Sequence, residues 1–216
     1  RDLHVRSRRQ RQMCIRDSAM AEANEEIGAV VIAGNRKAFF AGFDLGIIGT
    51  GDREKIVEMT SAGGALIRQA YGSKIPVVAA CTGHAVAAGA LMLLGCDYRV
   101  GTDAQVKIGL NEVAIGLMLP KWALAISKER IATQYLQVAV VNAKLMTSDL
   151  AVDAGFLDEV VAADKVVERA LEVAQGFAMD LDSKSYEKTV KAMRSSVLDE
   201  MDSGVAADRA AAGLST

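Results

Sequence analysis

The chain has 216 residues, of which 51% are hydrophobic and 24% charged, and its formal net charge is −2. These values exclude a disordered chain and a collagen-like fibre, and only three cysteines exclude a disulfide scaffold. A charge this close to zero gives no bulk electrostatic reason to expect nucleic acid as a partner. The length predicts one compact domain, or one and a half.

Residues 1–18 differ from the rest of the chain. They carry six arginines and show neither helical nor strand periodicity. A targeting segment or a native basic arm would also be rich in arginine and nearly free of acids. We interpret residues 1–18 as non-native or disordered sequence joined to a truncated gene, keep the other two alternatives open, and leave the segment out of the fold prediction.

The first part of the remaining chain alternates apolar runs and turns. The run IGAVVIA at residues 27–33 is rich in β-branched residues and predicts a strand buried on both faces. A short apolar loop at residues 38–45 and a glycine-rich mobile loop at residues 46–52 follow. Apolar residues at three-to-four spacing predict an amphipathic helix over residues 53–71, ended by Gly72.

Residues 75–96 carry no formal charge and are long enough to cross a bilayer. Pro76 and the sequence Thr-Gly-His at residues 82–84 interrupt the run, and no aromatic residues flank it. We therefore predict a buried strand at residues 77–81, a turn at residues 82–86 and a buried helix at residues 87–95, rather than a membrane span.

The later part of the chain is mostly helical. We predict short strands at 98–101, 106–109 and 160–161, and helices at 121–130, 131–141, 148–154 (N-cap Ser148), 164–180 (opened by Asp164) and 183–201, with a frayed tail from residue 203. Strands alternating with helices, followed by helices alone, predict an α/β core over residues 19–162 and a helical C-terminal segment over residues 163–216.

Several kinds of site are not supported by the residue pattern. The three cysteines have no metal-ligand spacing, and their low, odd number favours a reducing compartment. His84 is the only histidine outside residues 1–18, and no G-x-S-x-G elbow accompanies it. No Walker motif is present. We predict neither a metal site nor a Ser-His-Asp triad.

Two glycine-centred turns carry the functional argument. Residues 38–45 (AFFAGFDL) and 83–90 (GHAVAAGA) each follow a buried strand, where sites of α/β proteins usually lie. Ala88 falls in the first turn of a helix, whose N–H groups have no partner within the helix. Two such N–H groups converging on one oxygen would form an oxyanion hole, whereas the alternative is two tight turns in a packed core.

Four motifs follow one another in order over residues 27–178: AFFAGFDL, IPVVAACTGHAVAAGALMLLGCDYRV, AQVKIGLNEVAIGL and DAGFLDEVV. With this series of motifs the chain resembles the crotonase (enoyl-CoA hydratase/isomerase) superfamily. The resemblance implies a spiral of ββα units, here truncated before Ala19, with C-terminal helices packing on the body. It also implies a homotrimer or a hexamer.

The resemblance implies roles for individual residues. The N–H groups of Phe43 and Ala88 would form the oxyanion hole, and Glu112 would be the catalytic base. Hydratases of the family carry two glutamates, but the first of these positions holds Leu91 here. The run IGLNE, which contains Asn111, is most similar to the single-glutamate Δ3,Δ2-enoyl-CoA isomerases. The implied substrate-binding residues are Ala41, Gly42, Phe43, Asp44, Leu45, Gly46, Ala88, Leu91 and Asn111.

Shifting a double bond from C3 to C2 needs one base, which removes a proton from C2 and returns it at C4. A single buried glutamate with a raised pKa suits this reaction. We therefore expect a cytoplasmic enoyl-CoA isomerase of acyl-CoA metabolism, with coenzyme A as part of the substrate and no separate cofactor, nucleic acid or membrane partner. The alternatives are an enoyl-CoA hydratase and a non-catalytic acyl-CoA-binding or RNA-binding homologue. Glu112 could also be a surface or salt-bridge residue, and Asp44 is the next candidate for the base.

Overall fold

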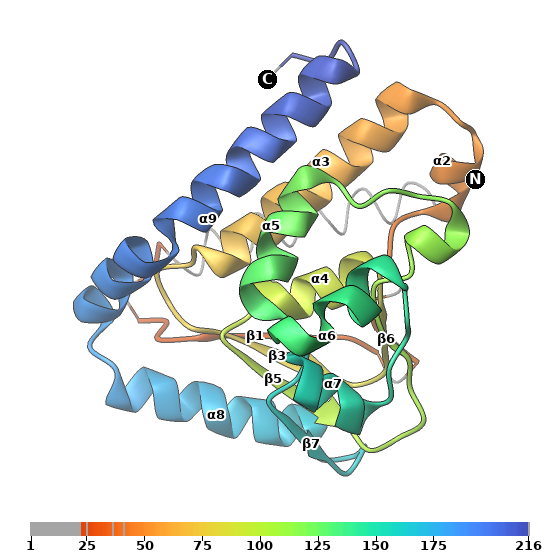
Figure 1. Ribbon diagram of the computed structural model, residues 1–216. Helices are drawn as coiled ribbons and strands as arrows, with labels where there is room; N and C mark the ends of the chain where they lie inside the picture. The colour runs from red at the N-terminus through yellow and green to blue at the C-terminus, as the bar shows by residue number, and fades with distance from the viewer. Residues whose placement is uncertain (1–22, 25, 36, 41, 216) are drawn as a thin grey trace.

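The computed structural model describes residues 23–24, 26–35, 37–40 and 42–215 (Figure 1). The interpretation of residues 1–18 lies outside the described residues, and so does the role expected for Ala41.

Two parallel sheets form the centre of the molecule. The larger has the strand order β1-β3-β5-β7 and the smaller the order β2-β4-β6. The strands of the larger sheet are β1 (Val30–Ala33), β3 (Val77–Cys81), β5 (Tyr98–Thr102) and β7 (Glu159–Val161). Those of the smaller are β2 (Ala38–Phe40), β4 (His84–Val86) and β6 (Ile108–Gly109). A strand of the larger sheet, a strand of the smaller sheet and then a helix follow one another three times, which confirms the spiral of ββα units.

Helices cover both sheets. They are α2 (Leu45–Gly49), α3 (Arg53–Tyr71), α4 (Ala88–Gly95), the 3-10 turn η1 (Val113–Ile115), α5 (Lys121–Arg130), α6 (Thr133–Leu136), the π-helical turn η2 (Gln137–Val141), α7 (Ser148–Ala154), α8 (Val166–Asp180) and α9 (Ser183–Ala211). None of the helices in the described part of the chain combines the length and the apolar character that a bilayer span requires.

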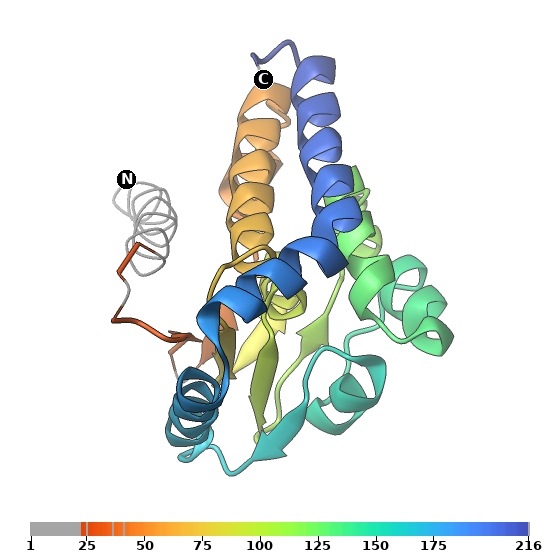
Figure 2. The same cartoon turned by 90° about the vertical axis from the view of Figure 1, so that its left-hand side faces the viewer.

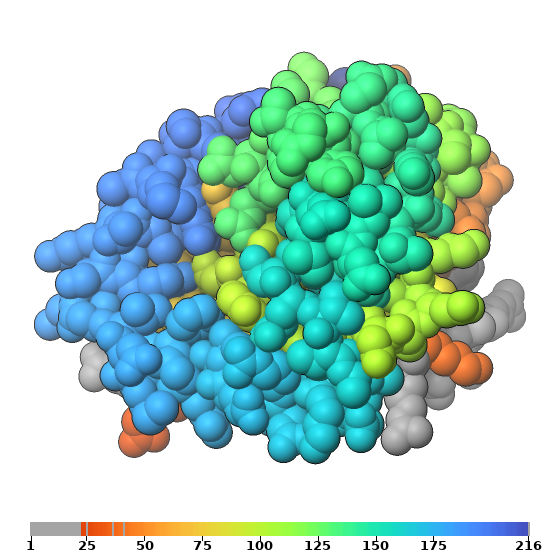
Figure 3. Space-filling model, turned by 60° about the horizontal axis from the view of Figure 1, so that its bottom comes forward, coloured from red at the N-terminus to blue at the C-terminus, as the bar shows by residue number. Residues whose placement is uncertain are grey.

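Strand β3 shows how the larger sheet divides the core. Every one of its residues is buried, as expected for a strand covered on both faces. Successive side chains of a strand point to opposite faces, so Val78 and Ala80 pack under α8 while Val77 and Cys81 belong to the main core. Figure 3 shows the molecule from this side, where α8 forms the lower part of the surface.

The last helix, α9, lies along α3 and α5 (Figures 1 and 2). An ion pair between Arg194 Nη2 and Asp97 Oδ1, 2.7 Å apart and almost fully buried, ties α9 to the end of α4. The same guanidinium donates a hydrogen bond of 2.7 Å to the Tyr71 carbonyl and lies 4.7 Å from the centre of the Tyr71 ring. A charge buried in this way is tolerated because it is paired and hydrogen-bonded.

The predicted fray from residue 203 is wrong, because α9 continues to Ala211. The alanines of this stretch favour a helix, and the close approach of Gly204 to Trp122 keeps it docked. A Cβ on Gly204 would lie 2.7 Å from the backbone nitrogen of Trp122, so only glycine lets α9 and α5 approach this closely.

Other corrections concern short elements. Residues 38–40 and 84–86 are strands rather than loop and turn, because they pair with each other across the smaller sheet. The end of the predicted apolar loop, Leu45, and residues 46–49 of the predicted mobile loop form α2, whose N-cap is Asp44. The N-cap of α7 is Thr147 rather than Ser148, whose hydroxyl instead donates to the Thr102 carbonyl at 2.6 Å. Lys165 rather than Asp164 precedes α8.

Candidate active site

The smaller sheet brings the two glycine-centred turns together. Strand β2 leads into the first turn and β4 into the second, and the two strands run parallel with Phe40 opposite Ala85. Both turns therefore leave the same edge of the sheet. The geometry confirms that the two motifs, more than 40 residues apart in sequence, meet in one place.

Two glycines allow this close approach. Gly42 has a φ of +95°, and a Cβ placed on it would lie 3.2 Å from the Val86 carbonyl oxygen and 3.3 Å from Ala87 Cβ. Gly89, in the first turn of α4, lies so close to the Phe40 carbonyl oxygen that a Cβ would overlap it. Any side chain at either position would push the two turns apart.

The second turn directs Ala88 into the start of α4. Ala87 has φ 54° and ψ −119°, a conformation that costs a non-glycine residue of order 1–3 kcal/mol. Its N–H donates to the Gly109 carbonyl at 3.0 Å, which holds the turn against β6. The first helical bond runs from Leu91 N–H to Ala87 O at 3.0 Å. The N–H of Ala88 thus belongs to the end of the helix where the dipole favours negative charge.

Sequence reasoning missed Ala87. A strained φ on alanine leaves no signal in the sequence, because glycine is the residue that usually marks such a turn. The only available signal was the short connection, because the chain must pass from the strand that ends at Val86 to the helix that begins at Ala88 through a single residue.

Glu112 follows β6 at the same edge of the smaller sheet. The register pairs Val86 with Gly109, so the chain leaving β6 passes the turn that holds Ala87 and Ala88. The carbonyl of Glu112 accepts hydrogen bonds from the N–H groups of Ile115 and Leu117, at 3.1 and 2.9 Å, which fixes this backbone at the start of η1.

Glu112 is 6% exposed, and its Oε2 is a buried atom without a hydrogen-bond partner among the described residues. Burial raises the pKa of this carboxyl, while the backbone N–H groups of Glu112 and Asn111 act in the opposite direction. The alternatives of a surface residue and a salt-bridge residue do not fit this environment. A buried carboxylate oxygen left without a donor is costly, and such groups occur where chemistry needs them.

The other expected residues have distinct surroundings. Leu91 lies in α4 and is completely buried in the main core. Asn111 is half-buried, and its Oδ1, like Glu112 Oε2, has no hydrogen-bond partner in the described part of the chain. Leu45 is 68% exposed at the start of α2.

Asp44 has a structural role. Its Oδ1 accepts a hydrogen bond of 2.8 Å from the N–H of Gly46, which caps α2. Because this oxygen is engaged in the cap, Asp44 is a weaker candidate for a base than Glu112, whose Oε2 has no partner among the described residues.

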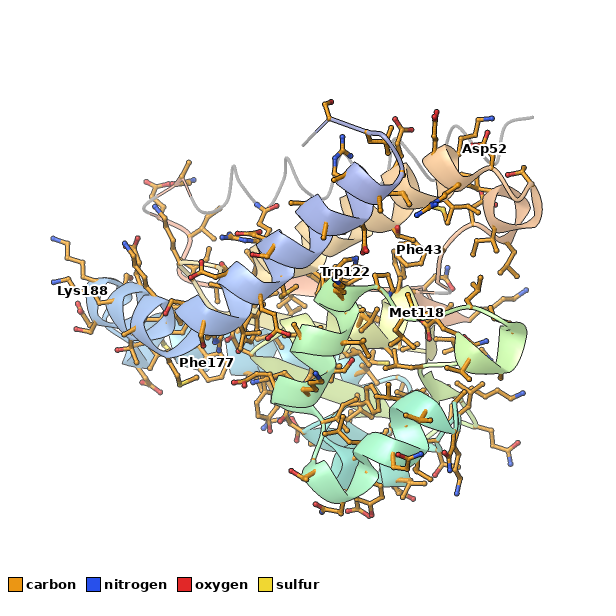
Figure 4. All side chains as sticks on the ribbon, turned by 45° about the horizontal axis from the view of Figure 1, so that its top comes forward. Phe43, Asp52, Met118, Trp122, Phe177 and Lys188 are labelled. Carbon is orange, nitrogen blue, oxygen red and sulfur yellow. The ribbon has the colours of Figure 1, made fainter. Side chains whose placement is uncertain are left out.

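Phe43 and its surroundings complete the first turn. The ring lies against Gly63 of α3, and Figure 4 shows Phe43 in the same region as Trp122 and Met118. Met118 belongs to the segment between η1 and α5 and is strongly exposed. In the described residues, no group of three or more His, Cys, Asp or Glu side chains could hold a metal ion.

Known proteins with similar structures include hydratases and isomerases alike. An enoyl-CoA hydratase of Mycobacterium ulcerans superimposes with a TM-score of 0.86 and 35% identity, covering 92% of this chain and 86% of that protein. An enoyl-CoA isomerase of Mycobacterium tuberculosis gives a TM-score of 0.85 and 35% identity, with the same coverage.

Sequence similarity extends to animal enzymes. The rat mitochondrial enoyl-CoA delta isomerase 1 is 30% identical over 183 residues, which are 83% of this chain and 63% of the rat protein. The chain therefore spans less than two thirds of that relative's length. The family model for enoyl-CoA hydratase/isomerase matches residues 13–212, beginning inside the arginine-rich segment, whose interpretation as non-native sequence stays a prediction. The match, the fold and the two turns together show that the chain belongs to the enoyl-CoA hydratase/isomerase family, as the crotonase resemblance indicated.

Proposed function

We propose that the protein shifts the double bond of 3-enoyl-CoA thioesters to the 2-position. The observation that carries the proposal is the buried carboxylate of Glu112, whose Oε2 has no partner among the described residues, with Leu91 buried where a second glutamate would stand in a hydratase. Hydration requires one group to activate water and one to handle the second proton, whereas isomerisation can use one base for both steps.

In the proposed reaction, Glu112 removes a proton from C2, and the electron pair moves into the thioester to form an enolate. The N–H groups of Phe43 and Ala88 hold the enolate oxygen, where the dipole of α4 adds favourable charge. The double bond then forms between C2 and C3 as protonated Glu112 gives its proton to C4. Burial of Glu112 supports both halves, because a raised pKa makes the carboxylate a stronger base and lets the carboxyl hold the proton between the two steps.

The remaining parts of the proposal concern binding and assembly. The coenzyme A moiety lies along residues 41–46, and no cofactor beyond the substrate's own coenzyme A is required. The protein forms a homotrimer or a dimer of trimers and acts in the cytoplasm. Analytical ultracentrifugation tests the assembly, and a monomer at micromolar concentration would refute it.

The ultraviolet absorbance of the thioester tests the reaction. Isomerisation of a 3-enoyl-CoA brings the double bond into conjugation with the carbonyl and raises the absorbance, whereas hydration of a 2-enoyl-CoA removes the conjugation and lowers it. We expect the rise to be much faster than the fall at equal substrate concentrations. A faster fall would make the protein a hydratase, and no change with either substrate would favour a non-catalytic homologue.

A further inference from the structure

Helix α3 contains two adjacent glycines, Gly63 and Gly64, in its interior. Glycine lowers helix propensity more than any residue except proline. Both glycines are buried, whereas their neighbours Ala62 and Ala65 are exposed and are alanine, a strong helix former. The two glycines therefore lie on the face of α3 that packs against the rest of the molecule.

Each glycine faces an aromatic ring. A Cβ on Gly63 would lie 2.5 Å from Phe43 Cε1 and 2.7 Å from Cζ, and a Cβ on Gly64 would lie 2.9 Å from Trp122 Cε2. All three distances are shorter than real Cβ contacts. The surface of α3 is thus shaped for the two rings, and Figure 4 shows both side chains in this region.

The Phe43 ring is one of two anchors of the first turn. On one side, Gly42 rests on Val86 and Ala87 of the second turn. On the other side, the Phe43 ring rests on α3 at Gly63 and packs against the main core. The backbone of Phe43, which carries one of the two N–H donors, is held between these contacts.

We infer that Gly63 is a positioning residue for the oxyanion hole, acting through the Phe43 ring on the Phe43 N–H. The inference rests on the proposed function, because it needs a thioester oxygen at the turn. Gly63 itself does not contact the substrate. It sets where the donor points by allowing the ring to lie flush against the helix.

The test is Gly63→Ala in the full chain, with Gly176→Ala as the matched control. Gly176 lies in α8, and no atom lies within 4 Å of the place where its Cβ would be, so the control makes the same chemical change without a contact. Displacing a positioned group by about 1 Å costs roughly 10²-fold in rate. We expect kcat of Gly63→Ala to fall by roughly 10²-fold with KM nearly unchanged, and Gly176→Ala to keep the unaltered kcat.

Carbonyl polarisation gives a second readout that does not depend on turnover. The infrared stretch of a 13C-labelled thioester carbonyl, in a saturated acyl-CoA, moves to lower frequency when donors hold the oxygen. We expect the unaltered chain and Gly176→Ala to show this shift and Gly63→Ala to lose part of it. A ring that swings aside without moving the backbone would leave the shift and kcat at their unaltered values, which would overturn the inference.

Phe43→Leu covers the case in which Gly63→Ala does not fold. It removes the ring from α3 while keeping the backbone N–H, and it should reduce the infrared shift in the same direction. The double variant Gly63→Ala/Phe43→Leu should polarise the carbonyl no less than Phe43→Leu alone, because the clash no longer exists. A full shift in Phe43→Leu would overturn the inference.

These measurements separate the inference from the proposed function. A chain that polarises the carbonyl but isomerises no 3-enoyl-CoA refutes the proposed function, while the infrared shift still tests Gly63. If the unaltered chain binds acyl-CoA without any shift of the carbonyl frequency, it has no oxyanion hole, and the inference about Gly63 is refuted.

Discussion

Replacing Glu112 by glutamine tests the base directly. The substitution keeps the size of the side chain and removes its ability to take a proton, and loss of a general base costs roughly 10²–10⁴-fold in rate. Because the thioester oxygen would be held by backbone N–H groups and the coenzyme A by the first turn, KM should change little. A fall in kcat at constant KM is the mark of an interaction made only in the transition state.

The same substitution should make the protein more stable at neutral pH. Burial raises the pKa of Glu112 above its ordinary value of 4.5, so the folded chain binds this proton more tightly than the unfolded chain does. Such a group contributes stability below its unfolded pKa and loses it as the pH rises through the folded pKa. Each unit of the upward shift corresponds to about 1.4 kcal/mol of destabilisation once the group is ionised.

Denaturant unfolding at two pH values measures this effect. The gain in the free energy of unfolding of Glu112→Gln over the unaltered chain should be larger at pH 8 than at pH 4. In the unaltered chain, kcat should rise with pH, with a midpoint above 4.5. Glu172→Gln, a change at an exposed glutamate of α8, is the control and should affect neither kcat nor this pH dependence.

Two results would refute the reasoning. A kcat close to that of the unaltered chain would show that the base is elsewhere and would redirect attention to Asp44. A lower stability of Glu112→Gln at pH 8 would show that the carboxylate is a structural partner rather than an uncompensated buried charge.

Two further substitutions test the surroundings of the site. Asp44→Ala removes the cap of α2 and should lower the free energy of unfolding by about 1 kcal/mol. We expect the variant to have a higher KM for acyl-CoA and a kcat near its unaltered value. A kcat loss as large as that of Glu112→Gln would identify Asp44 as the base. Arg194→Met leaves Asp97 buried without its partner and should cost about 3–5 kcal/mol, measured by denaturant unfolding. Arg68→Met breaks the exposed ion pair to Asp202 that joins α3 and α9, and it should cost at most about 1 kcal/mol; equal losses in the two variants would contradict the argument from burial.

The sequence predicted the elements whose signal is local. The uncharged run at residues 75–96 contains β3 and α4 close to their expected bounds, because continuous apolar residues are typical of fully buried elements. Helices α5 and α7 match their expected ranges. The family motif, rather than hydrophobic periodicity, predicted Glu112 as the base. The structure shows in addition that this residue is buried.

The elements that were missed depend on distant partners. Strands β2 and β4 have three residues each, too few for alternation to show. They form because β2 pairs with β4, which in turn pairs with β6. The last turns of α9 are ordered by contact with Trp122, which is about 80 residues away in sequence. The strain at Ala87 likewise follows from the β4–β6 pairing on one side and α4 on the other.

The position of α9 also has a consequence for synthesis of the chain on the ribosome. Its 29 residues follow every other described helix and strand, yet they cover the surfaces of α3 and α5, which are made much earlier. At about 5–20 residues per second, α9 takes roughly 1.5–6 s to translate, and until then the side chains beneath it face solvent. The nascent chain would therefore pass through a stage with two finished sheets and an uncovered apolar flank, a state that chaperones bind.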